Sequence, residues 1–468
     1  MLFSSMTFLF VFMPLVMAVY FLSKKEIRNY VLLIASIIFY AWGEPRYLAI
    51  MIITILVNYA GAILLDKHYS SRQRLWIVSL TIVLDLSFLF YFKYFNFVVD
   101  NINGVLATDF QLLDIIMPIG ISFYTFQAMS YLIDVYRREV PAQKDVYKLA
   151  LYIVLFPQLV AGPIVKYHDV CEQIDNRTIE FKNVIIGFKR FITGLAKKVL
   201  IANTLAEVVD KIFAQAPENL TTGVSWLGAV AYCLQLYYDF SGYSDMAIGL
   251  GLMFGFRFLE NFNYPYISKS ITEFWRRWHI SLATWFKLYL YIPLGGNRKG
   301  AVRTYWNLFA VFLVTGIWHG AAWSYVAWGI WNGIFIVIER FFGLDKDKND
   351  RWYVSAAKHL YAFFAIVWGM IIFRAESLSY AYEYICRMLH IDVTKHLPDY
   401  DYGVNNKFAI MLIVGLICAM PVCRNLIYIK YERKVQRTLV NIWLFLLFFW
   451  STISLAASTY NPFIYFRF

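Results

Sequence analysis

Long apolar runs recur along the whole chain, and they constrain its fold more than any other feature. They fall near residues 6–22, 30–43, 47–65, 75–97, 112–134, 147–165, 223–238, 241–256, 304–321, 322–342, 358–373, 407–423 and 438–457. A helix needs about 20 apolar residues to cross a bilayer, and backbone polar groups in lipid must be satisfied within the segment. Charged residues make up only 16% of the chain, against about 25% in a soluble domain. The runs predict an all-α, polytopic membrane protein and argue against a soluble protein with a large core.

Several runs are shorter than a full span. We therefore expect about ten to twelve transmembrane helices, together with re-entrant and amphipathic helices. No polar insert is long enough for a separate soluble domain, so we expect a single membrane domain over residues 1–468. Its expected parts are N-terminal spans at 1–110, a core that holds the site at 111–342 and C-terminal spans at 343–468.

The net charge of +12 follows the expected loops of a membrane protein. Lys and Arg gather in cytoplasmic loops, which is a simpler explanation than nucleic-acid binding. Basic residues follow the first, third and fifth runs, whereas the connection 98–113 contains no Lys or Arg. Near the other end, 425–437 is basic and 375–406 is rich in acids and tyrosine. This alternation predicts that both termini lie outside.

Proline and glycine interrupt the fifth and sixth runs. The interruptions are Met117-Pro118-Ile119-Gly120, Phe156-Pro157-Gln158 and Ala161-Gly162-Pro163, and polar residues such as Gln127 lie beside them. Broken helices at membrane depth are tolerated where they line a cavity or are buried in protein. The pattern indicates an internal polar cavity, with ordinary helix kinks as the simpler alternative.

Two polar segments interrupt the apolar pattern further along the chain. Within 166–222, apolar residues between 185 and 200 recur at helical spacing among lysines. This favours a basic amphipathic helix on the cytoplasmic surface, or a helix whose lysines face the phosphates of a soluble cofactor. Residues 237–245, YYDFSGYSD, fit a connecting loop, or a group of polar side chains that contacts a histidine or a substrate.

The stretch 271–332 contains the strongest functional signal. It contains His279 and His319, each next to a tryptophan, and eight of the fifteen tryptophans. A buried histidine in lipid is costly and usually has a function. The residues around His279 are strongly basic: Lys269, Arg276, Arg277, Lys287, Arg298, Lys299 and Arg303. This excess of positive charge indicates the cytoplasmic side of the membrane and suits the binding of a polyanionic ligand. Residues 280–294 are too few to span, so they suggest a re-entrant segment.

His319 is expected much deeper. The run 305–338 is too long for one helix, and Gly316, His319 and Gly320 mark the expected break. A helix that starts near Thr304 at the inner face would place His319 about 22 Å along its axis. A neutral imidazole there could act as a general base, and a packing histidine is the alternative.

Other kinds of site have little support. Two histidines forty residues apart, without a Cys motif or a nearby carboxylate, make a poor zinc site, and no Gly-x-Ser-x-Gly elbow is present. The residues alone fit acyl transfer from a soluble anionic donor, and they also fit a proton-coupled transporter.

Several segments, in this order, carry a resemblance to a known family. They are PIGISFYTFQ (118–127), FPQLVAGPI (156–164), YYDFSGYSDMAIG (237–249), NFNYPY (261–266), EFWRRWHISLATW (273–285), YIPLGGNR (291–298), WHGAAW (318–323) and PFIYFRF (462–468). With these segments the chain resembles the membrane-bound O-acyltransferase family. Within it, the chain is similar to the branch of the alginate O-acetyltransferase membrane subunit, with the teichoic-acid D-alanylation membrane protein as a more distant relative.

The resemblance implies the site residues and the donor. His319 would be the catalytic histidine and His279 the second signature position. The donor would be acetyl-CoA from the cytoplasm, used as a substrate, with no bound cofactor and no metal. Candidate donor- and substrate-binding residues are Arg276, Arg277, Lys287, Trp278, Trp318, Asp239, Ser241 and Tyr243. In the phrase at 285–289 the branch usually carries an Arg-Asp pair, whereas this chain has Lys287 and Leu288.

The resemblance also implies a cellular location, a reaction and a partner. The enzyme would lie in the cytoplasmic (inner) membrane of a bacterium and transfer acetyl groups for O-acetylation of an exported polysaccharide. A secreted or membrane-anchored partner of the SGNH-hydrolase type would complete the transfer, and no nucleic acid would bind. The alternatives are a proton-coupled transporter or flippase, a lipid O-acyltransferase, and an inactive structural subunit of an export assembly.

Overall fold

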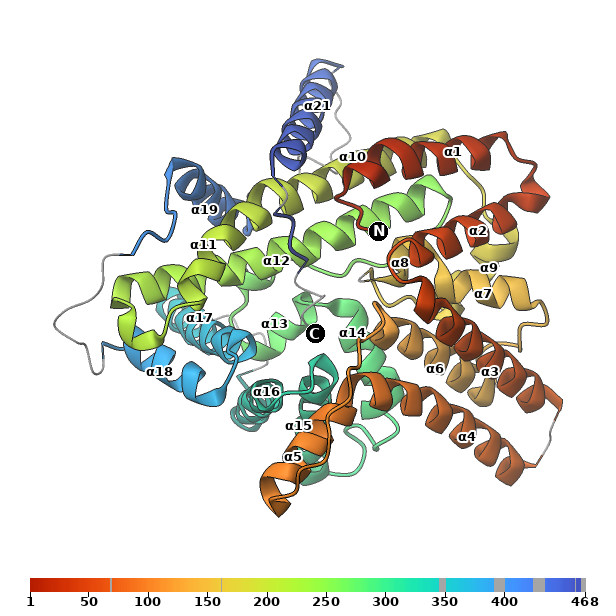
Figure 1. The fold of residues 1–468 in the computed structure, drawn as a ribbon, viewed down its shortest axis with the longest axis horizontal. Helices are drawn as coiled ribbons and strands as arrows, with labels where there is room; N and C mark the ends of the chain where they lie inside the picture. The colour runs from red at the N-terminus through yellow and green to blue at the C-terminus, as the bar shows by residue number, and fades with distance from the viewer. Residues whose placement is uncertain are drawn as a thin grey trace. The chain divides into compact units, whose positions relative to one another are not determined.

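The described part of the chain is built only of helices. The computed structural model describes residues 1–67, 70–160, 162–344, 351–390, 400–423, 434–458 and 460–463, and every regular element in these ranges is a helix (Figure 1). The all-α prediction is confirmed. The chain divides into two compact units, Met1–Phe191 with Ser244–Leu259, and Ile192–Tyr243 with Glu260–Phe468. No observation tests the single domain 1–468 or its three consecutive parts, so both stay predictions.

The first unit holds the N-terminal helices. Their bounds are η1 (Phe8–Phe12), α1 (Met13–Leu22), η2 (Lys25–Ile27), α2 (Arg28–Ala41), η3 (Pro45–Tyr47), α3 (Leu48–Lys67), α4 (Ser71–Leu89), η4 (Phe90–Tyr94), α5 (Phe95–Leu106), α6 (Ile121–Arg137), α7 (Val146–Val154), α8 (Phe156–Leu159) and α9 (Tyr167–Asn176). Helices α3, α4 and α6 pack on one another. Asn58 of α3 donates to buried Asp85 of α4 at 2.9 Å, so the acid is hydrogen-bonded inside this apolar unit.

The predicted breaks in the fifth and sixth runs are present. Helix α6 begins only at Ile121, because Gly120 before it adopts the left-handed conformation with φ 75°. Helix α7 ends at Val154, and α8 starts at Phe156 with Pro157 in its first turn, where a missing N–H is tolerated. Part of the third break, Ala161, lies outside the described residues.

The second unit holds most of the C-terminal part. Its elements are η5 (Lys197–Ala202), α11 (Asn203–Phe213), η6 (Pro217–Asn219), η7 (Pro265–Ile267), α13 (Ile271–Arg277), α14 (Ile280–Phe286), η8 (Lys287–Tyr291), α15 (Ala301–His319), α16 (Trp323–Phe342), α17 (Trp352–Arg374), α18 (Leu378–Met388), α19 (Asn406–Cys418), η9 (Pro421–Cys423) and α21 (Lys434–Ala457). Two helices, α10 (Phe181–Ala196) and α12 (Thr222–Met253), contribute residues to both units.

Four helical segments of the described chain are long and apolar enough to cross a membrane. They are Pro45–Lys67, Ser71–Leu106, Trp352–Arg374 and Thr438–Ala457, and Phe8–Leu22 and Asn406–Cys418 are shorter apolar helices. Apolar side chains are exposed on all four, as lipid contact requires; examples are Leu56, Leu80, Leu360 and Phe445. The expected total of ten to twelve spans stays a prediction.

The structure contradicts one sequence expectation about the middle of the chain and part of a second. Residues 237–245 are not a loop, because α12 runs through them without interruption. The basic helix expected on the surface continues from α10 into η5, where Lys198 is buried. The reason is charge pairing: Lys198 lies 2.7 Å from Asp239, and Arg190 lies 2.8 Å from Asp245. Each acid on α12 is thus neutralised by a base, which lets the helix carry charge through an apolar interior.

The break predicted near His319 is confirmed. Helix α15 ends at His319, Gly320 is extended, and α16 begins at Trp323, so the two helices form a tight hairpin. The helices approach closely at Gly316 and Gly329, where a Cβ on Gly329 would lie 3.1 Å from the Cα of Gly316. A larger side chain at either glycine would push the two helices apart.

Candidate active site

His319 lies at the C-terminal end of α15 inside a group of aromatic rings. Its side chain is buried, and its ring centroid lies 4.9 Å from Trp318, 5.1 Å from Trp328 and 5.1 Å from Phe373. Trp328 comes from α16 and Phe373 from α17, so three helices hold one imidazole. An imidazole held in this way can act as a proton acceptor toward a group that enters beside it.

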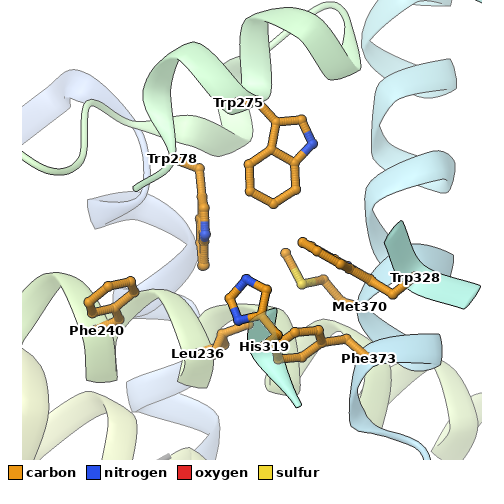
Figure 2. Close-up of a pocket in the computed structure, with 8 residues that line it drawn as sticks. All are labelled: Leu236, Phe240, Trp275, Trp278, His319, Trp328, Met370 and Phe373. Carbon is orange, nitrogen blue, oxygen red and sulfur yellow. The ribbon is translucent and has the colours of Figure 1, made fainter. Parts of the chain in front are cut away.

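A small cavity opens beside this imidazole. Figure 2 shows the His319 ring pointing into the space between Trp275 and Trp278, with Met370 and Phe373 on one side and Phe240 on the other. The full lining is Leu236, Phe240, Trp275, Trp278, His319, Trp328, Met370 and Phe373. All of these side chains are buried except that of Trp275, which is half-buried. The cavity is therefore apolar apart from the imidazole.

The cavity is also small. The space open to the centre of a water-sized group is about 20 Å³. On the same measure, a single water needs roughly 10–15 Å³. On this measure the cavity has room for one to two water-sized groups, so it fits a short group better than a long chain.

Helix α13, which carries Trp275 and leads into Trp278, is held in place by α16. Glu339 of α16 is fully buried, and its carboxylate accepts the backbone N–H groups of Ile271 at 2.5 Å and Thr272 at 2.8 Å. These N–H groups open α13 and have no partner within the helix, so the acid satisfies them and matches the helix dipole.

The indole of Trp275 is fixed by the same helix. Its Nε1–H donates to Asn332 of α16 at 3.0 Å, and the Asn332 amide donates in turn to the carbonyl of Trp328 at 2.8 Å. Two polar residues of α16, Glu339 and Asn332, therefore hold the tryptophan wall that faces His319.

His279 occupies a turn between α13 and α14. Its backbone is left-handed, with φ 46° and ψ 53°, which is strained for a residue with a side chain. The side chain is buried, and its Nδ1 lies 3.2 Å from Oδ1 of Asn261. His279 lies outside the four helices long enough to span a membrane, and burial lowers its pKa to about 3. This imidazole is neutral across the physiological range.

Phe240 of α12 lies near both histidines. It lines the His319 cavity, and its ring packs edge-on against His279 with the centroids 4.6 Å apart. The sequence predicts a much deeper position for His319 than for His279. The structure places both near one phenyl ring, while only His319 lines the cavity.

The basic residues predicted to bind the donor are largely accessible. Arg276 and Lys287 are exposed. Arg277 pairs with Glu273 at 2.8 Å and donates to the carbonyl of Asn263 at 3.1 Å, so it helps to hold its own helix. Leu288, at the position of the missing acid, is half-buried in η8.

The remaining predicted site residues fall into two groups. Trp278 lines the cavity, and Trp318 contacts the His319 ring. Asp239, Ser241 and Tyr243 are buried on α12 and do not belong to the cavity lining. Instead, Asp239 pairs with Lys198, and the Tyr243 ring packs on Phe463 at 4.9 Å.

Several residues of the site were not predicted from the sequence. Asn261, Asn332 and Glu339 hold the site in place, and Met370 and Phe373 line it. Glu339 had a usable signal, because it is the only acid in the apolar run 322–342. Met370 and Phe373 had none, because they look like any other apolar residues of a span.

The described residues form no metal site. Within the part of the chain that the structure describes, no three side chains of His, Cys, Asp or Glu come together as a metal ion would require. What the site offers is an imidazole at a small apolar cavity, with exposed basic side chains elsewhere in the same unit.

Comparison with known proteins identifies the family. The family model for membrane-bound O-acyltransferases matches residues 37–381, which is most of the chain. The chain belongs to this family. This acyltransferase is an enzyme with several membrane passes, and the matched range contains both histidines and the whole cavity lining.

Individual relatives agree with this assignment. The acyltransferase is 43% identical to the probable alginate O-acetylase AlgI of Pseudomonas putida, over 100% of both chains. It is 48% identical to the protein of the same name from Pseudomonas aeruginosa, over 82% of this chain and 74% of that one. It is 32% identical to the peptidoglycan O-acetyltransferase of Helicobacter pylori, over 93% of this chain and 89% of that one. The resemblance to the alginate O-acetyltransferase branch is thereby confirmed.

Proposed function

We propose that this acyltransferase takes an acetyl group from cytoplasmic acetyl-CoA and passes it across the membrane for O-acetylation of an exported polysaccharide. The observation that carries the proposal is the imidazole of His319 at a small, apolar cavity. The names of the relatives, which refer to alginate and to peptidoglycan, support a polysaccharide as the final acceptor.

The chemistry is an acyl transfer with His319 as the base. A hydroxyl of the acceptor gives its proton to the imidazole while its oxygen attacks the thioester carbonyl. The C–S bond then breaks, and the CoA thiolate takes the proton from the imidazolium. The net result is an ester and a free thiol, with the imidazole returned to its neutral form.

The size and the polarity of the cavity support acetyl as the group transferred. A volume of about 20 Å³ favours a short acyl group over a long one, and apolar walls offer water few hydrogen-bond partners near a thioester. His279 positions donor or acceptor in this scheme, near Phe240.

Exposed basic residues support an anionic donor. Arg276 and Lys287 are exposed at the start and the end of the segment that contains His279. Basic side chains of this kind bind phosphate by charge and, for Arg, by bidentate geometry, and CoA carries phosphates. We assign the donor's phosphates to this surface, on the cytoplasmic side of the bacterial inner membrane, with both termini outside.

A partner completes the proposal. The acetyl group reaches the polysaccharide through a secreted or membrane-anchored protein of the SGNH-hydrolase type, as the family resemblance implies. Co-purification of such a protein with this acyltransferase, and loss of polysaccharide acetylation when the partner is deleted, are the expected results.

The decisive experiment measures thiol release from acetyl-CoA by the purified protein in lipid nanodiscs. The wild type is expected to release CoA, and His319→Ala is expected to lose at least about a hundredfold in kcat. His359→Ala is a matched control, because that half-buried histidine lies on α17 outside the cavity lining. Wild-type activity in His319→Ala, or substrate transport without thiol release, would overturn the proposal. Acetylated phospholipid as the only product would replace the polysaccharide by a lipid acceptor.

A further inference from the structure

We propose that Asn261 is a positioning residue that fixes the proton of His279 on Nδ1 and leaves the lone pair on Nε2. His279 then acts as a hydrogen-bond acceptor at Nε2. The catalytic meaning of this assignment rests on the proposed function, whereas the protonation pattern itself follows from the hydrogen bonds around Asn261.

The first step is to identify the two ends of the Asn261 amide. The backbone N–H of Ser281 can only donate, and it lies 3.1 Å from one amide atom of Asn261. That atom must therefore be the oxygen, Oδ1. The Ser281 hydroxyl donates to the same oxygen at 2.9 Å, which agrees with this orientation.

The second step concerns the imidazole. Nδ1 of His279 lies 3.2 Å from the same Oδ1. An amide oxygen can only accept, so Nδ1 must carry the hydrogen. A neutral imidazole has one N–H group, so Nε2 holds the lone pair. His279 is buried, which keeps the ring neutral and this single pattern in place.

The third step is the backbone. The carbonyl of Asn261 accepts the N–H of Ile280 at 3.0 Å, and the N–H of Asn263 donates to the carbonyl of Arg277 at 2.9 Å. The segment around Asn261 thus holds both sides of the left-handed turn at His279. One residue fixes the place of the histidine with its backbone and the tautomer with its side chain.

The position of the proton limits what His279 can do chemically. Nε2 of His279 can receive a hydrogen bond from a hydroxyl, but it cannot donate one to a carbonyl oxygen. His279 therefore orients a group that donates a proton, as an acceptor hydroxyl does. It does not stabilise the negative charge that develops on a thioester carbonyl.

The direct test reads the tautomer without activity. Histidine labelled with ¹⁵N in the wild-type protein gives nitrogen shifts that distinguish Nδ1–H from Nε2–H, and the signals that disappear in His279→Gln identify this residue among the seven histidines. The expected result is a neutral ring protonated on Nδ1. A ring protonated on Nε2, or on both nitrogens at pH 7, overturns the proposal, whatever the enzyme's substrate is.

The kinetic test uses three variants in the thiol-release assay. Asn261→Leu removes the acceptor and is expected to lower kcat at least about tenfold with little change in KM, because the tautomer is no longer set. Asn261→Asp keeps an accepting oxygen and is expected to restore most of the loss at high pH. Ser281→Ala is the control, because the backbone donor to Asn261 remains and the imidazole keeps its acceptor.

The pH profile separates this role from a purely structural one. Two charged groups lie close in the chain to His279 and to Phe240, and both are already paired: Arg277 with Glu273 on α13, and Asp239 with Lys198. A new carboxylate in Asn261→Asp would therefore raise the pKa of His279 by about 1–3 units and introduce an acidic limb in kcat/KM that the wild type lacks.

Two kinetic outcomes contradict the role of Asn261. One is an Asn261→Leu variant that is folded and as active as the wild type. The other is an Asn261→Asp variant that stays inactive at every pH while its melting temperature matches that of the wild type. Absence of turnover in the wild type would overturn the proposed function alone, because the labelling experiment would still report the tautomer.

Discussion

The two histidines of this acyltransferase are held by different kinds of interaction. His319 ends a nineteen-residue helix and is surrounded by the rings of Trp318, Trp328 and Phe373. His279 lies in a strained turn between two seven-residue helices, where one amide accepts from its Nδ1. Packing against rings is weakly directional and leaves room at the imidazole for a substrate. A hydrogen bond to a fixed amide is directional and sets which nitrogen is protonated.

This difference suggests separate duties. The ring-lined region, which is formed by Trp318, Trp328 and Phe373 around His319, offers water few hydrogen-bond partners and limits the size of what can approach the imidazole. The hydrogen-bonded region, Asn261 and the turn at His279, sets the orientation of the His279 ring and decides which ring nitrogen carries the proton. Changes in the first region should alter rate and acyl-group size, and changes in the second should alter kcat and pH dependence.

The largest expected effect distinguishes the two imidazoles directly. His319→Ala removes the base at the cavity and should lower kcat by about 10²–10⁴-fold. His279→Ala removes one orienting hydrogen bond and should lower kcat by about 10–100-fold. Steady-state thiol release from acetyl-CoA measures both. Equal losses in the two single variants and in the double variant would show that the histidines act as one unit and would break the comparison.

The next effect tests what holds the ring-lined region together. Glu339→Leu leaves two N–H groups of α13 and the hydroxyl of Tyr361 without their acceptor, and should lower the free energy of unfolding by about 2–5 kcal/mol. The activity should fall with it, because Trp275 and Trp278 lose their support.

The matched control is Glu383→Leu, which replaces an exposed acid on α18. Thermal unfolding in detergent measures both variants. A Glu339→Leu protein as stable as the control would show that α13 is held mainly by packing.

The next prediction concerns His279 alone: it should make the free energy of unfolding depend on pH. Burial lowers the pKa of His279 from 6.5 to about 3, so protonation favours the unfolded chain. The stabilising contribution is complete above pH 6.5 and is lost as the pH falls from 6.5 toward 3. At pH 5 the loss is about 2 kcal/mol for this residue, at 1.36 kcal/mol per unit.

The measurement is the difference in unfolding midpoint between pH 7 and pH 5. The wild type should lose more stability over this interval than His279→Gln, because the variant has no titratable side chain at position 279. An identical pH dependence in the two proteins would show that His279 is not the buried neutral base described above.

The smallest expected effect concerns acyl-group size. Met370→Ala shortens a flexible side chain at the cavity and should raise kcat/KM for propionyl-CoA about tenfold relative to acetyl-CoA. Met388→Ala is the control, because that methionine is also buried but lies on α18 outside the cavity lining. Competition between the two thioesters measures the ratio. An unchanged ratio in Met370→Ala would mean that another part of the enzyme sets the acyl length.

The site shows where prediction from the sequence succeeds. The all-helical membrane fold follows from the apolar runs, because backbone groups in lipid leave few alternatives to helix. The helix break after His319 follows from its glycines, and the two histidines stand out because imidazoles are rare in such runs. These are local signals, and each is complete within one short stretch of the chain.

The tertiary structure decided the features that depend on partners far apart in sequence. Asp239 and Asp245 are compatible with a continuous α12 only because Lys198 and Arg190 neutralise them. The cavity wall exists because Glu339 meets the start of α13, sixty-eight residues before it. By itself the sequence determined the helical membrane fold and the two candidate imidazoles, since composition and spacing suffice for both. Only the packing decided which imidazole faces a cavity and which is held by an amide, because pairing and burial arise when distant segments meet.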